Sequence, residues 1–232
     1  FYDGGKYFDT ASAKEHAGRL CDEGADIIDI GGESSRPGAK RISEQEEIDR
    51  VCPVIEFAAR NFDTVVSVDT CRAGVAAAAL GAGATIINDI SALVLDDEMA
   101  PLAARTGASV VLMHMKGTPE TMQDNPVYGD VVAEVAAFLE ERADFAIRAG
   151  VARERIIIDP GIGFGKTLEH NYTILRNLER FTRSGFPVLI GLSRKSLIGK
   201  LYTVESDRLP ATIALNAIAA FGGADIIRVH DV

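Results

Sequence analysis

The chain has 232 residues, of which 47% are hydrophobic and 25% charged, as expected of one ordinary globular domain spanning residues 1–232. No apolar run approaches the roughly 18 residues of a membrane span, and the net charge of −10 argues against a nucleic-acid-binding surface. The three cysteines form no CxxC pair, so we expect no structural zinc and a reduced, cytoplasmic protein.

Short β-branched runs alternate with longer helical stretches along the whole chain. Strands are predicted at 27–30, 65–68, 85–87, 110–113, 156–158, 188–190 and 226–229, and helices near 12–24, 43–60, 72–82, 96–106, 131–149, 168–184 and 207–222. The strand runs are almost continuously apolar, which is typical of parallel strands buried on both faces. We therefore expect an α/β fold of the (β/α)8 TIM-barrel type, with the first strand and the last helix missing from this sequence. A doubly wound open sheet is the alternative fold.

A glycine-rich segment, Asp-Pro-Gly-Ile-Gly-Phe-Gly-Lys at 159–166, directly follows one predicted strand. Its Gly-Lys-Thr ending suggests a phosphate-binding P-loop, but that motif requires a glycine where Pro160 stands. We interpret the segment instead as the end of a barrel strand that carries the carboxylate of Asp159. The role of Lys166 is left open.

Polar groups follow every predicted strand, at the end where barrel enzymes place their active sites. The phrases are GGESSRPGA at 31–39, SVDT at 67–70, NDI at 88–90, MHMKGTP at 113–119, DPGIGFGK at 159–166, GLSRKS at 191–196 and RVHDV at 228–232. This ordered set closely resembles the dihydropteroate synthase family of pterin-binding barrels. The resemblance implies a transferase of folate biosynthesis and a sulfonamide target. It would join dihydropterin pyrophosphate to para-aminobenzoate in an SN1-like reaction that gives dihydropteroate and pyrophosphate. The family usually forms homodimers and uses Mg²⁺.

The residue types suit a pterin, whose flat edge carries an amino group and ring N–H donors. Carboxylate acceptors at Asp69 and Asp159, helped by the amide of Asn88, would satisfy these donors with strong directional bonds. By resemblance, Lys195 contacts the pterin carbonyl and Arg228 stacks on one ring face. The resemblance also assigns the walls of the ring slot to Met113, Phe164 and Gly191.

The resemblance places the remaining chemistry at other strand ends. Cations are needed for the departing pyrophosphate, and the catalytic set is expected to be Arg36, Lys195, Arg228 and His230. The para-aminobenzoate pocket is expected to contain Ser35, Arg36, Pro37, Phe164, Lys195 and Ser196. The asparagine that binds the metal in the family would lie before Phe1, so we expect no metal ligand within this sequence.

Several positions and two alternative functions stay open. Asp29 and Arg194 receive no role, and His114 is interpreted as structural because it points away from Met113. One alternative is a methyltetrahydrofolate-dependent methyltransferase, which has no pyrophosphate to bind and would not need Arg36, Lys195 and Arg228 together. The other is a catalytically inactive pterin-binding module.

Overall fold

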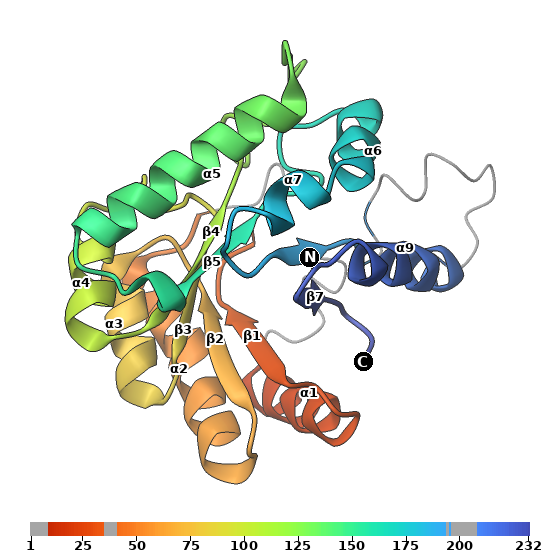
Figure 1. Cartoon of the computed structure of the whole chain (residues 1–232). Coiled ribbons are helices and arrows are strands. Elements are labelled where there is room, and N and C mark those ends of the chain that lie inside the picture. Colours follow the sequence, from red (N-terminus) through yellow and green to blue (C-terminus); the bar gives the residue numbers. More distant parts are fainter. Residues whose placement is uncertain (1–8, 35–40, 194, 196–207) are drawn as a thin grey trace.

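The computed structural model describes residues 9–34, 41–193, 195 and 208–232, in which strands and helices alternate along the chain (Figure 1). All seven predicted strands are confirmed, with ends shifted by one or two residues. They are β1 (Ile27–Gly31), β2 (Val65–Asp69), β3 (Ile86–Asp89), β4 (Ser109–Met113), β5 (Ile156–Asp159), β6 (Leu189–Gly191) and β7 (Ile226–Arg228).

The helices also follow the prediction, with one exception. They are α1 (Thr10–Asp22), α2 (Glu44–Asn61), α3 (Ala73–Ala82), α4 (Met99–Thr106), α5 (Val131–Arg148), α6 (Leu168–Arg176), α7 (Glu179–Thr182) and α9 (Leu209–Phe221), with a short 3-10 turn η1 (Arg153–Arg155). The single helix predicted at 168–184 is wrong, because the chain breaks into α6 and α7 at Asn177. The Asn177 side chain donates to the carbonyl of Thr173, a local bond through which asparagine competes with helix continuation.

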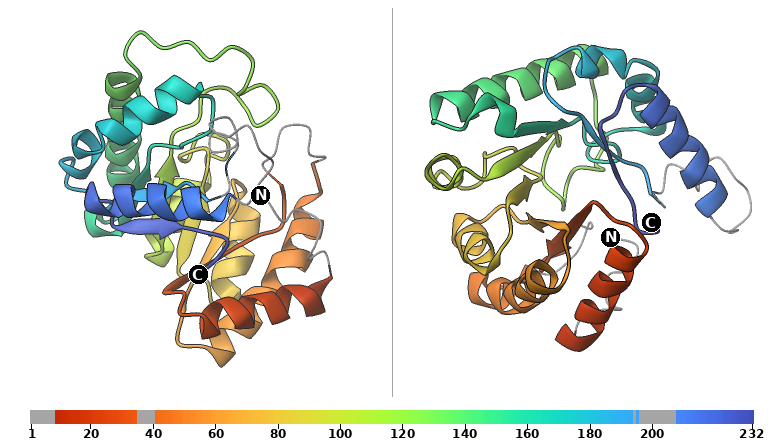
Figure 2. Two further views of the ribbon diagram at one scale, coloured as in Figure 1. Left: turned by 90° about the vertical axis from the view of Figure 1, so that its right-hand side faces the viewer. Right: turned by 60° about the horizontal axis from the view of Figure 1, so that its bottom comes forward.

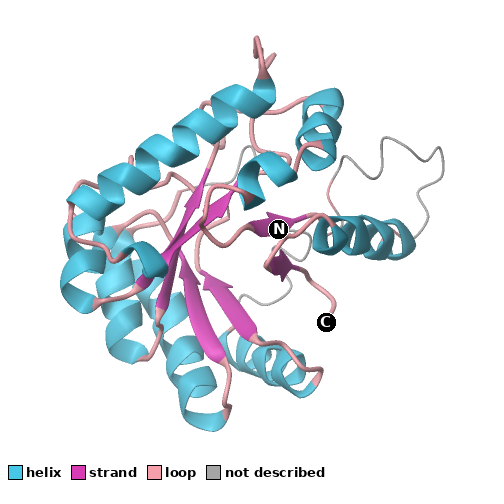
Figure 3. Cartoon of the chain, in the orientation of Figure 1, coloured by secondary structure: helices cyan, strands magenta, loops and turns pink. Residues whose placement is uncertain are grey.

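All the strands pair in parallel and in chain order. The ladder runs β1-β2-β3-β4-β5, a bridge between Ile158 and Val188 continues it, and β6 pairs with β7. A doubly wound sheet would reverse its strand order at a switch point, so the unreversed order excludes that alternative. The strands instead follow the (β/α)8 barrel pattern, with helices outside and strands inside (Figure 3). The expectation that the first strand of the barrel is missing from this sequence stays a prediction.

Every residue of β3, β5 and β6 is buried, so both faces of these strands are covered, and alternate residues lie on each face. Ile87, Leu112 and Ile158 belong to the main core, together with residues of the surrounding helices. Figure 2 shows these helices arranged around the strands. Val111 and Ile157 belong to a smaller apolar cluster formed by the intervening strand positions. This explains why the strand sequences are continuously apolar rather than alternating. Among the described residues, no helix has both the length and the apolar character needed to cross a membrane.

The register of the strands aligns their carboxyl ends. Gly31 pairs with Asp69, and Asp69 pairs with Asn88 on the next strand. Further along the sheet, Met113 pairs with Asp159, and Gly191 pairs with Arg228. Residues that are far apart in the sequence are thereby held at a common height at one end of the barrel.

Candidate active site

A bonded group of side chains connects the ends of β1, β2, β3 and β7. One oxygen of Asp29, Oδ2, accepts from Asn88 Nδ2 at 2.9 Å and from Arg228 Nε at 2.7 Å. The guanidinium of Arg228 also reaches Asp69 Oδ2 at 3.4 Å. Three of the predicted pterin contacts, Asp69, Asn88 and Arg228, are therefore brought together. The residue that joins them is Asp29, to which the sequence assigned no role.

The charges in this group perturb one another. Burial and the neighbouring Asp29 carboxylate raise the pKa of Asp69 to about 7, although the Arg228 guanidinium opposes the shift. Burial alone would lower the pKa of Arg228, but the carboxylates of Asp29 and Asp69 more than offset it and raise that pKa. Arg228 therefore stays a cation between two acidic groups, and Asp69 titrates close to neutral pH.

Asp159 lies in a second group at the end of β5. Its carboxylate is buried, and Oδ1 accepts from the backbone N–H of Gly161 at 2.7 Å. Burial raises the pKa of Asp159, and the nearby Lys195 ammonium is the largest effect opposing this rise. Burial likewise lowers the pKa of Lys195 to about 8, against the attraction of Asp159. The structure thus places these two predicted pterin contacts within electrostatic reach of each other.

Lys195 is held against the glycine-rich segment at 159–166, here called the glycine loop. Its ammonium donates to the carbonyl of Ile162 and lies 5.0 Å from the centre of the Phe164 ring. A side-chain carbon added to Gly191 would lie 3.7 Å from Lys195 Nζ and 3.8 Å from Arg228 Cβ. A glycine at the end of β6 therefore keeps open the space between these two cations, as expected for a wall of a flat slot.

An apolar cluster forms beside the charged groups. Met113 and Phe164 are both buried and pack with Ile90 and Met122, and the partly buried Met115 joins them. Met113 and Phe164 are the two apolar contacts predicted for the pterin ring. Met113 ends β4, and Phe164 lies in the loop that follows β5, the strand that pairs with β4. The charged and apolar halves of the predicted slot thus meet at the carboxyl ends of the strands.

His230 follows β7. Its described bonds go to Ser193, whereas those of Arg228 go to Asp29 and Asp69. Its backbone N–H donates to Ser193 Oγ at 3.2 Å, and its ring Nδ1 lies 2.9 Å from the same oxygen. Ser193 follows β6, so the two strand ends are tied together at this point. The anion-binding role predicted for His230 stays a prediction.

A pocket of about 240 Å³ lies beside Asp69, lined among others by Ile90 and Met115. Its acidic wall holds an ion-pair group that sequence reasoning missed. Arg72 bonds Glu33 and Glu47, each at 2.8 Å, and links the loops after β1 and β2 to helix α2. No motif marked Glu47, because its burial on the inner face of α2 becomes visible only in the folded chain.

Some predicted residues fall outside the described part of the chain. These are Ser35, Arg36 and Pro37 of the expected para-aminobenzoate pocket, Ser196 of the same pocket, and the unassigned Arg194. Within the part that the structure describes, no group of three His, Cys, Asp or Glu side chains is arranged to hold a metal ion.

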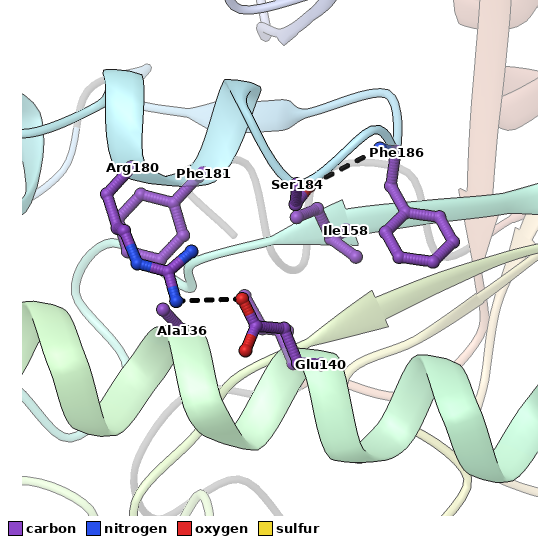
Figure 4. A pocket seen from close by; sticks show the side chains of 8 residues that line it. Ala136, Glu140, Ile158, Arg180, Phe181, Ser184 and Phe186 are labelled. Atoms are coloured by element: carbon purple, nitrogen blue, oxygen red, sulfur yellow. Dashed lines mark hydrogen bonds and ion pairs between the residues drawn. The ribbon is translucent and has the colours of Figure 1, made fainter.

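A second hollow lies outside the barrel, between α5 and α7 (Figure 4). Arg180 bonds Glu140 at 2.8 Å beside it, and the rings of Phe181 and Phe186 form its apolar lining. Its volume is about 10 Å³, which is room for about one water molecule. This hollow is a packing crevice rather than a ligand site.

Comparison with known proteins decides the family. The family described as "Pterin binding enzyme" matches residues 1–230. The dihydropteroate synthase of Escherichia coli K12 is 47% identical over 233 residues, covering 100% of this chain and 82% of that protein. The chain belongs to the dihydropteroate synthase family.

Solved structures of dihydropteroate synthases agree with this assignment. The Yersinia pestis enzyme in a sulfonamide drug complex superposes with a TM-score of 0.95 at 45% identity, covering 99% of this chain and 83% of that one. The Xanthomonas albilineans enzyme with 4-aminobenzoic acid gives a TM-score of 0.91 at 45% identity, covering 100% and 83%. The resemblance that the strand-end motifs carry is confirmed, and the chain is a transferase of the dihydropteroate synthase type.

Proposed function

We propose that this chain joins dihydropterin pyrophosphate to para-aminobenzoate at the carboxyl ends of its barrel strands, giving dihydropteroate and pyrophosphate. The observation that carries the proposal is the convergence of Asp69, Asn88, Asp159, Lys195 and Arg228 at one end of the barrel. Further support comes from the X. albilineans relative, whose structure contains 4-aminobenzoic acid.

The proposed pterin contacts follow from donor and acceptor chemistry. Asp69 and Asp159 supply the carboxylate acceptors for the amino and ring N–H groups of the pterin edge. Lys195 supplies a donor for the pterin carbonyl. With a pKa of about 8, its amine is mostly protonated at neutral pH and carries all three donor hydrogens. Phe164 and Met113 then form apolar walls of the slot for the ring.

The proposed reaction needs charge stabilisation more than proton transfer. The bond between the pterin methylene carbon and the pyrophosphate oxygen breaks, and its electron pair leaves with the pyrophosphate. Arg228, with Arg36 and His230, is proposed to bind this developing negative charge. The aniline nitrogen then forms the new C–N bond and gives up one proton. An aniline is neutral at pH 7, so this step requires no strong general base.

The described residues do not form a site for the Mg²⁺ that the resemblance implies. Asp29 Oδ1 is buried without a hydrogen-bond partner and is of the oxygen type that Mg²⁺ prefers. One such oxygen is too few, and the described part of the chain offers no three-residue group for a metal. Mg²⁺ stays a proposed partner, and no step above depends on it. The cytoplasmic location and the homodimer are also proposals, and light scattering tests the homodimer.

The function is tested by mixing the purified chain with dihydropterin pyrophosphate and labelled para-aminobenzoate, with and without Mg²⁺. We expect labelled dihydropteroate and one pyrophosphate for each product molecule. If no dihydropteroate forms, calorimetric titration shows whether the chain binds the pterin pyrophosphate. Tight binding without turnover would favour an inactive pterin-binding module, and no binding would refute the synthase function.

A further inference from the structure

Lys166, which the reaction scheme above does not use, is almost completely buried. Only 3% of its surface is exposed, and burial lowers its pKa well below the usual range. Its amine contacts four acceptors: His114 Nδ1 at 2.8 Å and the carbonyls of His114, Gly161 and Phe164 at 3.3, 2.9 and 3.0 Å. A buried lysine is costly unless its donors are satisfied, so this degree of bonding indicates a specific task.

The four acceptors belong to two segments that pack backbone against backbone. Gly161 and Gly165 have φ angles of +67° and +64°. A side-chain carbon at Gly161 would lie 1.9 Å from the carbonyl oxygen of His114, and one at Gly165 would lie 2.5 Å from that of Lys116. The backbone of the glycine loop therefore packs directly against the segment that follows β4. Lys166 bonds both segments at once.

Two acceptors of Lys166 are directly linked to groups that the proposed function assigns to the pterin. Gly161, one acceptor, gives its N–H to the carboxylate of Asp159. Phe164, another acceptor, carries a ring of the proposed slot. Other contacts hold the outer part of the loop, where Gly163 N–H donates to Asn171 and Tyr128 OH donates to Gly165. In the inner part, Lys166 bonds the carbonyls of Gly161 and Phe164, and Lys195 bonds that of Ile162 between them.

His114 completes this arrangement as a fixed acceptor. When the Lys166 amine is protonated it can only donate, so Nδ1 is then the acceptor and the ring proton is on Nε2. Burial and the Lys166 charge lower the pKa of His114 to about 3, so the ring stays neutral and keeps its acceptor. The ring packs edge-on against Phe138 with centroids 5.0 Å apart, and the backbone N–H of His114 donates to the carbonyl of Asp159.

We propose that Lys166 is a positioning residue which, through His114 and the carbonyls of Gly161 and Phe164, holds the glycine loop so that Asp159 and Phe164 face the pterin. This inference rests on the proposed function, because it assumes that the pterin binds at Asp159. A purely structural lysine would affect the stability of the fold and leave pterin affinity unchanged in the molecules that stay folded.

The test measures pterin affinity and folding separately. Calorimetric titration with dihydropterin pyrophosphate at low temperature, well below the unfolding transition, gives Kd for folded protein. Lys166→Met keeps an unbranched side chain, shorter by one atom, but removes its donors, and we expect Kd to rise at least tenfold. Lys14→Met on α1, far along the chain from the loop, is the matched control and should leave Kd unchanged.

A pair of substitutions at His114 provides an independent measurement. In His114→Asn the amide oxygen can occupy the place of Nδ1 and still accept from Lys166, so affinity should stay close to that of the unsubstituted protein. His114→Leu removes the acceptor, and we expect weaker pterin binding. If Lys166→Met does not fold, this pair decides the question by itself.

Three results would overturn the inference. The first is a folded Lys166→Met protein with unchanged Kd, even if its unfolding temperature falls. The second is His114→Leu binding the pterin as well as His114→Asn does. The third is failure of the unsubstituted protein to bind the pterin pyrophosphate at all, and that result alone would also overturn the proposed function.

Discussion

Asp69 is the residue whose protonation most directly controls the proposed site. It lies near a like charge, Asp29, and near a cation, Arg228, which bonds both carboxylates. The pKa of about 7 follows from burial and from the Asp29 charge, which together outweigh the attraction of Arg228. Asp69 can accept hydrogen bonds from pterin N–H groups in full only when it is ionised.

We therefore expect pterin affinity to depend on pH near neutrality. As the pH falls through about 7, Asp69 takes up a proton and loses acceptor capacity, so dihydropterin pyrophosphate should bind more weakly. Titrations from about pH 5.5 to 8.5 measure this, with Asp69→Asn as the reference because it cannot ionise there. An identical pH profile in both proteins would contradict the role given to Asp69.

Asp159→Asn tests the other carboxylate. The substitution turns an acceptor-only group into a mixed donor and acceptor, and a hydrogen bond to a charged group contributes about 2 kcal/mol, so pterin affinity should fall roughly 30-fold. Calorimetric titration measures the loss. Asp144→Asn, on the exposed surface of α5, is the control and should bind normally. Unchanged affinity in Asp159→Asn would refute its assignment as a pterin contact.

At the scale of elements, the loops after the strands depend on backbone shapes that most residues avoid. The loop after β3 has two consecutive non-glycine residues in the left-handed region, Ala92 at φ 55° and Leu93 at φ 64°. Asp89 accepts from the N–H of Leu93, and the guanidinium of Arg142 on α5 donates to the carbonyls of both Ala92 and Leu93. These bonds explain how a strained turn persists.

Arg142→Met should destabilise this turn. The substitution keeps much of the apolar stem but leaves two carbonyls without their charged donor, so the free energy of unfolding should fall by about 1–3 kcal/mol. Urea denaturation measures the change. The control is Arg148→Met, at an exposed position on the same helix, where the effect should be within about 0.5 kcal/mol. Equal stabilities of the two variants would contradict the account of the turn.

In the glycine loop after β5, Gly161 can be compared with Gly107, which follows α4. Gly161 and Gly107 have nearly the same φ angle, +67° and +70°, but of these two only Gly161 has a neighbour within 4 Å of an added side-chain carbon. Alanine at Gly107 should cost only backbone strain, about 1 kcal/mol. Alanine at Gly161 must also displace the loop from His114, so pterin affinity should fall well beyond that of the Gly107 variant. Equal affinities would show that the close approach is not needed for binding.

At the scale of the whole molecule, much of the fold follows from the sequence, because strands buried on both faces are continuously apolar and easy to distinguish from helices. The break at Asn177 could not be predicted, since one local side-chain bond decides it. The strand-end motifs indicated Asp69, Asn88 and Asp159. They did not indicate the role of Asp29, because its partner Arg228 is 199 residues away and is brought near only by the barrel. Lys166 was misleading because three of its four partners are backbone carbonyls, which leave no signal in the sequence.

The proposed pterin site lies at the carboxyl ends of the strands, between the Asp159 group and the Asp29–Arg228 group. The most direct measurement is a crystal structure of the protein with dihydropterin pyrophosphate. We expect the pterin edge within hydrogen-bond distance of Asp159, Asn88 and Asp69, with its ring against Met113 and Phe164. A pterin bound elsewhere, or bound here without contact to Asp159, would contradict this expectation.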